Sequence, residues 1–249
     1  MKFLGIIPAR YASTRFPGKP LVDIGGKPMI QRVYEQARTT VDELIVATDD
    51  KRIAEAVHQF GGHVVLTARE HHSGTDRCYE AFHNTGMFFD VVINIQGDEP
   101  FIQPEQIELL KKCFSEPDTQ IATLAKPFDK GDDFEQIFNT NTPKVVINNR
   151  NEAMYFSRSV IPFIRGIENQ KWIEKHIFYK HIGLYAYRSD ILKEITALPQ
   201  SLLEIAESLE QLRWLQNGYK MKVAITNQET IGIDTPEDLK KAMALMVDI

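Results

Sequence analysis

The sequence predicts an α/β fold with a mostly parallel central sheet and an inserted antiparallel lobe. From Phe3 to Phe114, short apolar segments alternate with segments of helical period, as in parallel strands joined by helical crossovers. From about Gln120 the pattern changes to successive extended segments, which favours antiparallel strands. The 249 residues can bury one large core, so we expect a single domain, 1–249, with a lobe inserted at about 120–190 that covers a site or supplies a dimer surface.

The first three elements follow from the hydrophobic pattern. Phe3–Ile7 is a short apolar run that predicts a strand stopping at Pro8. Pro28–Thr39 predicts a helix that begins with a proline, where the missing N–H does no harm. Its apolar residues fall on one face: Ile30, Val33, Tyr34 and Ala37. Leu44–Ala47 predicts a strand that is buried on both faces.

The later elements continue the same pattern up to the lobe. We expect helices at 51–60, 75–83 and 104–114, and strands at 63–67 and 91–100. Four extended segments without a convincing helix follow, at 120–128, 144–151, 153–163 and 181–188. One long helix is expected at 202–216, with an apolar stripe of Leu202, Ile205, Leu209, Leu212 and Leu215. A last strand at 219–226, a turn at 232–239 and a closing helix at 239–247 complete the chain.

Composition excludes several classes of protein. A net charge of -5 and a pI near 5.8 argue against a nucleic-acid-binding surface. Cys78 and Cys113 lack the spacing of a zinc site or a disulfide framework, so we expect reduced thiols in a cytoplasmic protein. The apolar run at the amino terminus is too short for a signal peptide, and no segment approaches eighteen consecutive apolar residues, so we expect no membrane span.

The loop from Ile7 to Leu21 concentrates positive charge at the carboxyl end of the first strand. It carries Arg10, Arg15 and Lys19 among small residues, and ligands of open α/β sheets bind at this edge. The loop therefore predicts a nucleoside triphosphate site, the alternative being a basic surface loop. It is neither a Walker A loop nor a dinucleotide-binding fingerprint, because the glycines that those motifs require are missing.

Two acidic residues, Asp98 and Asp234, are the candidate metal ligands. Asp98 ends a hydrophobic strand too far from the next helix to cap it. Asp234 precedes a helix, but Thr235 is better placed as its N-cap, with Asp238 three residues later as in a capping box. Two carboxylates at strand ends suit Mg²⁺ when triphosphate oxygens complete its coordination shell.

Three further segments carry polar residues, and spacing alone does not decide whether these have a structural or a binding role. His71–Arg77 predicts either a helix start or a contact with a nucleoside, equally. The period of two in the segment 181–188 places His181, Gly183 and Tyr185 on one face, which could simply be an exposed polar face. Glu210 and Gln211 could likewise lie on the solvated flank of a helix.

Six segments together resemble one family. IPARYASTRFPGKPL, HHSGTDR, INIQGDEP, HIGLYAYR, ESLEQLRWLQNG and GIDTPEDL occur here in the order typical of 3-deoxy-D-manno-octulosonate (Kdo) cytidylyltransferases. The resemblance runs through essentially the whole chain. It implies a Rossmann-like nucleotidyltransferase fold, CTP and Kdo as substrates, Mg²⁺ as cofactor and a homodimer. It also implies that the protein acts in the cytoplasm, in lipopolysaccharide synthesis.

The resemblance also implies roles for individual residues. Lys19, Arg15, Asp98 and Asp234 would be catalytic, with the two aspartates holding magnesium. The residues expected to contact CTP are Pro8, Ala9, Arg10, Arg15, Lys19, Ser73, Gly74, Thr75, Arg77 and Gln96. The residues expected to contact Kdo are Arg158, His181, Tyr185, Glu210 and Gln211.

Other activities are alternatives to this interpretation. The sugar could be an 8-amino variant of Kdo, an N-acylneuraminate or a hexose 1-phosphate. The related N-acylneuraminate enzymes typically carry a Ser-Lys-x-x-Pro-Gly-Lys-Asn loop, where this chain has Ser13-Thr14-Arg15 and Lys19-Pro20. A non-catalytic nucleotide-binding protein is the alternative from a different class. Release of diphosphate from CTP with each sugar separates these possibilities.

Overall fold

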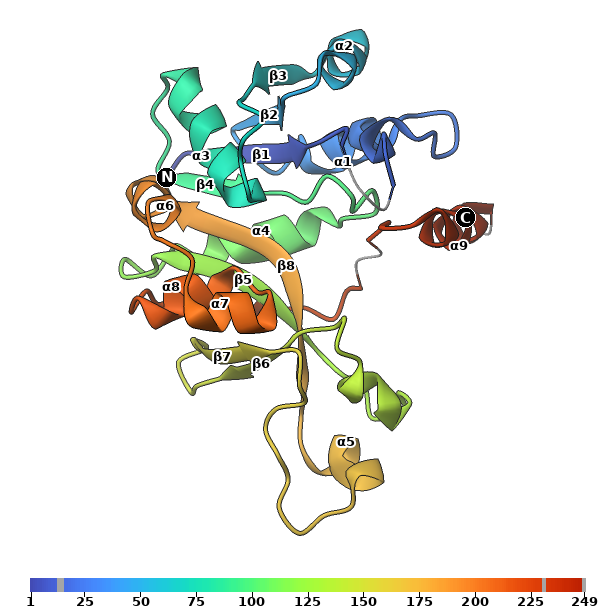
Figure 1. Cartoon of the computed structure of the whole chain (residues 1–249), viewed down its shortest axis with the longest axis vertical. Coiled ribbons are helices and arrows are strands. Elements are labelled where there is room, and N and C mark those ends of the chain that lie inside the picture. The colour runs from blue at the N-terminus through green and yellow to red at the C-terminus, as the bar shows by residue number, and fades with distance from the viewer. Residues whose placement is uncertain (13–15, 230–231, 248–249) are drawn as a thin grey trace. The chain divides into compact units, whose positions relative to one another are not determined.

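A computed structural model gives the fold of the chain and describes residues 1–12, 16–229 and 232–247 (Figure 1). The chain forms two compact units, which are described separately. The first comprises Met1–Glu108, Ala186–Thr196 and the described residues from 232 onward. The second comprises Leu109–Tyr185 and Ala197–Glu229. Among the described helices, none combines the length and the apolar character needed to cross a bilayer.

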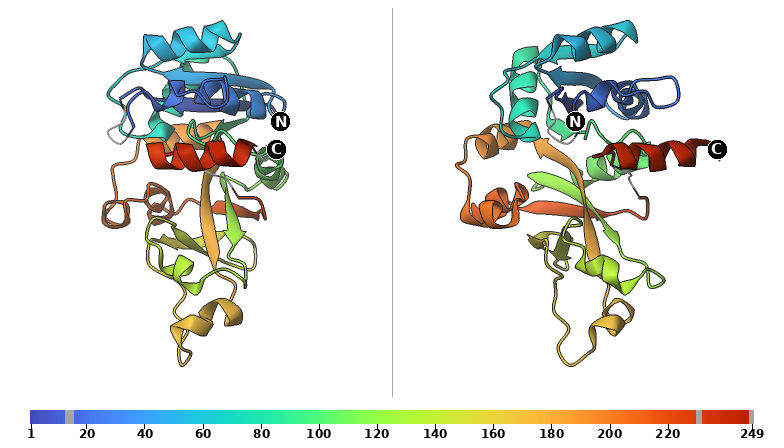
Figure 2. Two further views of the ribbon diagram at one scale, coloured as in Figure 1. Left: turned by 90° about the vertical axis from the view of Figure 1, so that its right-hand side faces the viewer. Right: turned by 45° about the vertical axis from the view of Figure 1, so that its right-hand side comes forward.

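The first unit is built on the predicted parallel sheet. Its strands are β1 (Phe3–Ala9), β2 (Glu43–Thr48), β3 (His63–Leu66) and β4 (Val91–Asn94), in the order β3-β2-β1-β4, and Figure 2 shows them from two further sides. All three pairings are parallel. The side chains that fill its core include the fully buried Leu4, Ile6, Ile7, Leu44 and Val46. The prediction from the alternating strand and helix segments is confirmed.

Strand β1 continues through Pro8, where the sequence predicted its end. The Ile6 carbonyl accepts a hydrogen bond from Ile95, so Ile6, and Pro8 two residues later, face the β4 side. Since β4 ends at Asn94, opposite Ile6, the missing N–H of Pro8 removes no bond from the sheet.

Four helices of the first unit lie close to their predicted positions: α1 (Met29–Ala37), α2 (Lys51–Gln59), α3 (Gly74–Thr85) and the start of α4 (Pro104–Cys113). The closing helix, α9 (Pro236–Val247), begins earlier than predicted, and α6 (Ser189–Thr196) was not predicted. A short 3-10 helix, η1 (Lys19–Leu21), lies in the opening loop. Helix α2 begins where the Asp50 side chain accepts a hydrogen bond from the Arg52 N–H, because an N-cap satisfies a donor at the helix start.

The second unit is antiparallel only in part. Strands β6 (Lys144–Ile147), β7 (Ala153–Ser157) and β8 (Tyr179–Arg188) pair antiparallel, as predicted. Strand β5 (Ile121–Pro127) lies between β8 and β9 (Met221–Ile225) in the sheet, and its parallel pairing with β9 was not predicted. A parallel pairing needs a long crossover connection, and the chain between the two strands supplies one.

The lobe also contains short helices that the sequence pattern did not predict. These are η2 (Phe134–Phe138), η3 (Asn169–Lys171) and α5 (Trp172–Lys175). They gather around a buried cluster of Phe128, Ile137, Trp172, Ile173 and Phe178. Elements this short have too few residues to show a helical period, which explains the omission.

The predicted helix at 202–216 is two helices, α7 (Leu202–Glu207) and α8 (Gln211–Gln216). Ser208 between them has φ of 51°, a left-handed conformation that ends the first helix. The predicted apolar stripe is therefore wrong in its first half: Leu202 is 79% exposed and Ile205 59% exposed, whereas Leu209 and Leu212 are buried.

A buried ion pair joins these two helices and gives a stability prediction. The Arg213 guanidinium donates to both carboxylate oxygens of Glu204, at 2.8 and 2.6 Å. We expect Arg213→Met to lower the free energy of unfolding by about 3–5 kcal/mol, because it leaves a buried carboxylate unpaired. Urea denaturation measures this. The double variant Glu204→Gln/Arg213→Met should regain most of the loss, and a single variant as stable as the parent chain would contradict the prediction.

Candidate active site

Three segments of the first unit meet at the carboxyl end of β1. A Cβ atom on Gly97, in the loop after β4, would lie 2.9 Å from the Pro8 carbonyl oxygen, so only glycine allows this approach. A Cβ atom on Gly74, at the start of α3, would lie 3.5 Å from Pro8 Cγ. The opening loop, the start of α3 and the loop after β4 are therefore neighbours, as expected at this edge of a parallel sheet.

Lys19 lies at the centre of the predicted triphosphate and metal site. Its Nζ is 2.8 Å from Asp98 Oδ2 and 3.0 Å from Asp234 Oδ1. Gly18, before it, has φ of 72°, and its N–H donates to the Tyr11 carbonyl at 2.9 Å, so the backbone at Lys19 is fixed on one side. The structure thus brings together three residues that are far apart in sequence and were predicted to share one site.

The capping box predicted at α9 is present. Thr235 Oγ1 accepts a hydrogen bond from the Asp238 N–H at 3.2 Å, and Asp238 Oδ2 accepts one from the Thr235 N–H at 3.0 Å. The cap therefore uses Thr235 and leaves the Asp234 carboxylate to Lys19. A backbone hydrogen bond from Ile233 to the Asp98 carbonyl, at 2.9 Å, joins the segments that carry the two aspartates.

Charge around Lys19 keeps its side chain protonated. Burial lowers the pKa of Lys19, but attraction by Asp98 and Asp234 outweighs it, so the pKa is raised and the side chain stays an ammonium. Burial, and then the charge of Asp98, raise the pKa of Glu99 to about 8. Glu99 is therefore mainly a neutral acid at pH 7. Sequence reasoning missed it, although its place beside Asp98 in an acidic pair was a visible signal.

The carboxylates of Asp98 and Asp234 fit part of a divalent-cation site. Both oxygens lie within 3.0 Å of one nitrogen, so they face one point in space. Among the residues that the structure describes, no group of three or more His, Cys, Asp or Glu side chains converges on a metal-sized position. An oxygen-preferring cation held here would need further ligands from phosphate oxygens and water, which is how Mg²⁺ is commonly bound.

Arg10 connects the end of β1 to the start of α3. Its Nη2 donates to the carbonyl oxygens of His71 at 2.6 Å and Ser73 at 3.2 Å. Ala9 beside it is buried. Arg15, the other arginine predicted to bind phosphate, lies outside the described residues.

The segment His71–Arg77 forms a helix start, as one of its two interpretations predicted. Ser73 and Asp76 make a capping box at α3, and Thr75 is 2% exposed. Arg77 is fully buried, and its Nη1 lies 3.1 Å from Asp49 and 2.5 Å from Thr67 Oγ1. Arg77 is thus placed to support the segment, and a nucleoside contact by this segment or by the half-buried Gln96 stays a prediction.

In the second unit, His181 and Tyr185 are packed rather than exposed. The His181 ring lies edge-on to Phe156, with centroids 4.9 Å apart, and Tyr185 lies edge-on to Trp214 at 5.3 Å. Tyr185 is only 8% exposed. The alternative of an exposed polar face with its aromatic side chain partly covered was wrong in its exposed part, since Tyr185 is buried and His181 and Gly183 are only partly exposed. The period of two does not reveal which side chains cover the face.

One hydrogen-bond chain sets the tautomer of His181. Thr123 Oγ1 lies 2.9 Å from the Leu184 carbonyl, which can only accept, so the hydroxyl proton points there. His181 Nε2, 3.0 Å from the same Oγ1, must then be the donor. The neutral ring carries its proton on Nε2 and presents Nδ1 as an acceptor.

Burial of His181 predicts a pH effect on stability. Burial lowers its pKa to about 3, whereas the unfolded chain titrates near the ordinary value of 6.5. Below pH 6.5 the unfolded state therefore binds a proton that the folded state rejects, and stability falls as the pH falls. We expect His181→Gln to reduce this slope by about 1.4 kcal/mol per pH unit between pH 6 and 4.

Urea denaturation across that pH range measures the slope for His181→Gln. His58→Gln, on the exposed side of α2, is the matched control and should leave the slope unchanged. An unchanged slope in His181→Gln would contradict a buried, neutral ring at this position.

Gln211 and Arg158 also lie in the second unit. Gln211 is 3% exposed at the start of α8, and its Nε2 has no hydrogen-bond partner among the described residues, so a solvated flank is wrong for it. Burial, and then the charge of Glu210, raise the pKa of Tyr185. Arg158 donates to the carbonyl oxygens of Glu207, Thr140 and Ser208, at 2.6, 2.9 and 3.2 Å, and so ties the turn at Ser208 to the lobe.

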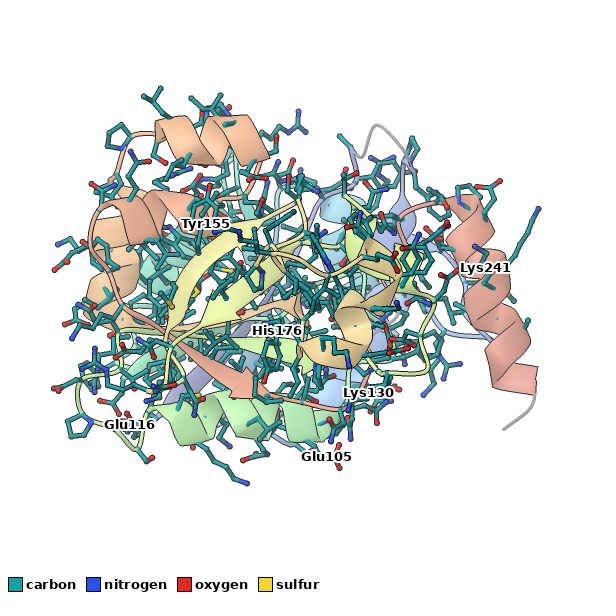
Figure 3. The ribbon with its side chains drawn as sticks, turned by 90° about the horizontal axis from the view of Figure 1, so that it is seen from below. Glu105, Glu116, Lys130, Tyr155, His176 and Lys241 are labelled. Atoms are coloured by element: carbon teal, nitrogen blue, oxygen red, sulfur yellow. The ribbon has the colours of Figure 1, made fainter. Side chains whose placement is uncertain are left out.

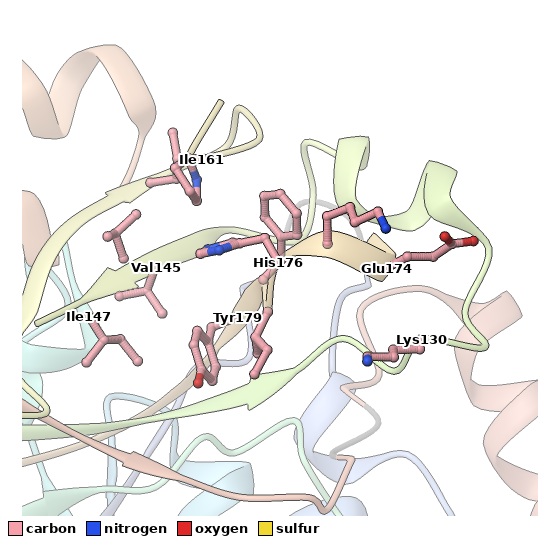
Figure 4. A pocket seen from close by; sticks show the side chains of 12 residues that line it. Lys130, Val145, Ile147, Ile161, Glu174, His176 and Tyr179 are labelled. Carbon is pink, nitrogen blue, oxygen red and sulfur yellow. The ribbon is translucent and has the colours of Figure 1, made fainter. Parts of the chain in front are cut away.

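A pocket of about 520 Å³ in the second unit contains none of the predicted site residues. It is lined by apolar side chains of β6 and by Ile161, with His176, Lys130 and Glu174 at its wall (Figure 4). Figure 3 labels His176 and Lys130 on the whole chain. The apolar lining of the pocket does not match the charged triphosphate and metal site predicted from the sequence.

Comparisons with known proteins connect the chain to one family. The profile of the cytidylyltransferase family matches residues 4–231. The chain is 68% identical to a 3-deoxy-manno-octulosonate cytidylyltransferase of Parabacteroides distasonis, over 100% of this chain and 99% of that protein. It is 65% identical to one of Bacteroides thetaiotaomicron, over 97% of each.

Solved structures agree with these relatives. A CMP:2-keto-3-deoxy-manno-octonic acid synthetase complexed with CTP has a TM-score of 0.91 and 45% identity, covering 100% of this chain and 99% of that one. A cytidylyltransferase from Leptospira borgpetersenii shares the fold, with a TM-score of 0.65 at 14% identity, covering 100% of this chain and 88% of that one.

Proposed function

The chain belongs to the 3-deoxy-manno-octulosonate cytidylyltransferase family, and from this premise we propose how its residues carry the reaction. It is a nucleotidyltransferase that activates Kdo with CTP, giving CMP-Kdo and diphosphate for lipopolysaccharide biosynthesis. The observation that best supports the residue assignment is the cluster of Lys19 with Asp98 and Asp234. It unites a cation for phosphate and two carboxylates for a metal at the ligand-binding edge of the sheet.

The transfer requires a divalent cation, which we propose is Mg²⁺ held by the carboxylates of Asp98 and Asp234. When bound, Mg²⁺ polarises the α-phosphate of CTP and lowers the pKa of a hydroxyl beside it. The backbone bond between Ile233 and Asp98 and the cap at Thr235 position the two carboxylates for this role.

Positive side chains handle the charge of the triphosphate. The anomeric hydroxyl oxygen of Kdo attacks the α-phosphorus in line, its bond to phosphorus forms, and the bond from that phosphorus to the bridging oxygen of diphosphate breaks. The hydroxyl proton passes to solvent. Lys19 and Arg15 neutralise the leaving diphosphate, and Arg10 binds phosphate through guanidinium nitrogens other than its Nη2. No covalent enzyme intermediate is required.

The cytidine side of the site lies along the end of β1 and the start of α3. We propose that Pro8 and Ala9 contribute main-chain contacts, and that Ser73, Gly74, Thr75 and Gln96 lie by the nucleoside. Arg77 is buried, and its contacts with Asp49 and Thr67 hold this segment in position. The capped start of α3 holds the segment in one conformation.

Residues of the second unit bind the sugar acid in this proposal. The Nδ1 atom of His181 accepts a hydrogen bond from a sugar hydroxyl, because the Nε2 proton is donated to Thr123 Oγ1. Gln211 Nε2 is a buried donor with no partner in the described part of the chain, and it suits a carboxylate or hydroxyl oxygen. Tyr185 and Glu210 complete the sugar contacts, and Arg158 positions the turn that carries Glu210.

We further propose a homodimer that works in the cytoplasm, with the lobe at about 120–190 serving sugar binding or dimerisation. Gel filtration with light scattering tests the dimer. A monomer at micromolar concentration would remove this part of the proposal.

Sugar specificity is tested by diphosphate release from CTP and Mg²⁺ with Kdo, 8-amino-Kdo, N-acetylneuraminate and a hexose 1-phosphate in parallel. We expect the highest kcat/KM for Kdo. A higher value for the amino sugar or the neuraminate would reassign the substrate. No release with any sugar would favour a nucleotide-binding protein without activity.

A further inference from the structure

Lys19 contacts one oxygen of each carboxylate that the proposed metal would use. Its Nζ lies 2.8 Å from Asp98 Oδ2 and 3.0 Å from Asp234 Oδ1. Magnesium binds carboxylate oxygens at about 2.0–2.1 Å in a crowded octahedral shell. An ammonium held between the same two oxygens occupies that position, so Lys19 and the cation exclude one another there.

The positions of the two carboxylates are set by the surrounding backbone. Asp98 follows Gly97, whose contact with the Pro8 carbonyl leaves no room for a Cβ. Asp234 lies between Ile233, bonded to the Asp98 carbonyl, and the capped residue Thr235. Two negative groups held this close repel one another, and the ammonium relieves the repulsion.

The side chain of Lys19 can leave while its backbone stays. Gly18 and Leu21 bracket it in a hydrogen-bonded turn, in which Leu21 N–H donates to the Gly18 carbonyl at 2.9 Å. The Lys19 side chain is 14% exposed, and the two carboxylates are 32% and 47% exposed. The site therefore has a solvent-facing side toward which a flexible four-carbon stem can turn.

We propose that Lys19 is an internal counter-ion that holds the metal-binding carboxylates until the nucleotide arrives. A triphosphate gives the ammonium a new anionic partner and supplies further oxygen ligands for the cation. Metal and nucleotide consequently bind with positive coupling, and the cation alone binds weakly because it must displace Lys19. The inference rests on the proposed role of Asp98 and Asp234 as metal ligands.

The first test measures binding of Mn²⁺ by electron paramagnetic resonance, without CTP or Kdo. Lys19→Met should bind Mn²⁺ about tenfold more tightly than the parent chain, within the usual range of coupling between sites. Lys27→Met, which removes a lysine paired with Glu35 on the surface of the same unit, should have no effect. Equal or weaker Mn²⁺ binding by Lys19→Met would overturn the proposal.

Adding Asp98→Asn to Lys19→Met should abolish the gain in Mn²⁺ affinity. A gain that persists would overturn the metal-ligand assignment, and the counter-ion role with it. Because these titrations contain no substrate, they are independent of whether the parent chain releases diphosphate from CTP and Kdo. Failure of the counter-ion role is thereby distinguished from failure of the transferase activity.

A second measurement needs no variant. Amine-reactive labelling of the parent chain, read by mass spectrometry, reports how accessible each lysine is. Saturating Mn²⁺ should increase the labelling rate of Lys19, because the displaced ammonium turns to solvent, and leave that of Lys27 unchanged. A Lys19 rate that does not rise at saturation would contradict the exchange.

Discussion

Asp98→Asn lowers kcat for CMP-Kdo formation by about 10³- to 10⁵-fold and leaves the fold intact. Asparagine keeps the shape of the side chain but removes the negative charge that a divalent cation requires. One well-placed cation contributes about this much to phosphoryl transfer, corresponding to about 4–7 kcal/mol of barrier. Diphosphate release measures the loss, and the urea midpoint checks the fold.

Asp118→Asn, on the exposed surface of the second unit, is the matched control and should retain full turnover. Asp98→Asn should also show weakened Mn²⁺ binding in the presence of CTP. Turnover within tenfold of the parent chain would remove Asp98 from the catalytic centre.

Lys19→Ala is the second large effect, with kcat expected to fall by about 10³-fold or more. The ammonium neutralises charge that builds on the departing diphosphate, an interaction that strengthens in the transition state and therefore affects kcat. Stopped assays with saturating CTP and Kdo measure it. Lys27→Ala is the control, since Lys27 pairs with Glu35 on the exposed surface of the same unit.

The two roles of Lys19 predict that removing its ammonium changes metal affinity and turnover in opposite directions. Loss of the ammonium should tighten binding of the cation alone and yet slow turnover. A lysine that merely stabilised the loop would weaken both together. A Lys19→Ala enzyme with near-normal kcat would contradict the catalytic role even if its metal affinity rose.

The first half of the fold could be predicted because its signals are local. Alternation of apolar strands with amphipathic helices is visible within short windows, and parallel pairing follows from the helical crossovers. Asp98 and Asp234 were found by asking which helix each could cap, and the structure places both on Lys19. This worked because capping depends on residues only a few positions apart.

The remaining features depend on contacts that sequence spacing does not encode. The parallel pairing of β5 with β9 joins segments far apart in the chain. The break at Ser208 requires a left-handed residue other than glycine, which carries little sequence signal. Gln211 and Tyr185 are buried because aromatic and helical neighbours cover them in three dimensions.

The central claim is that Asp98 and Asp234 act as one metal-binding unit in cytidylyl transfer. A double-mutant cycle on kcat, with Asp98→Asn, Asp234→Asn and the double variant, tests it most directly. If both carboxylates act through one cation, the double variant should be no more than about tenfold slower than the slower single variant. A double variant slowed by the full product of the two single effects would show that the aspartates act independently and would contradict the account.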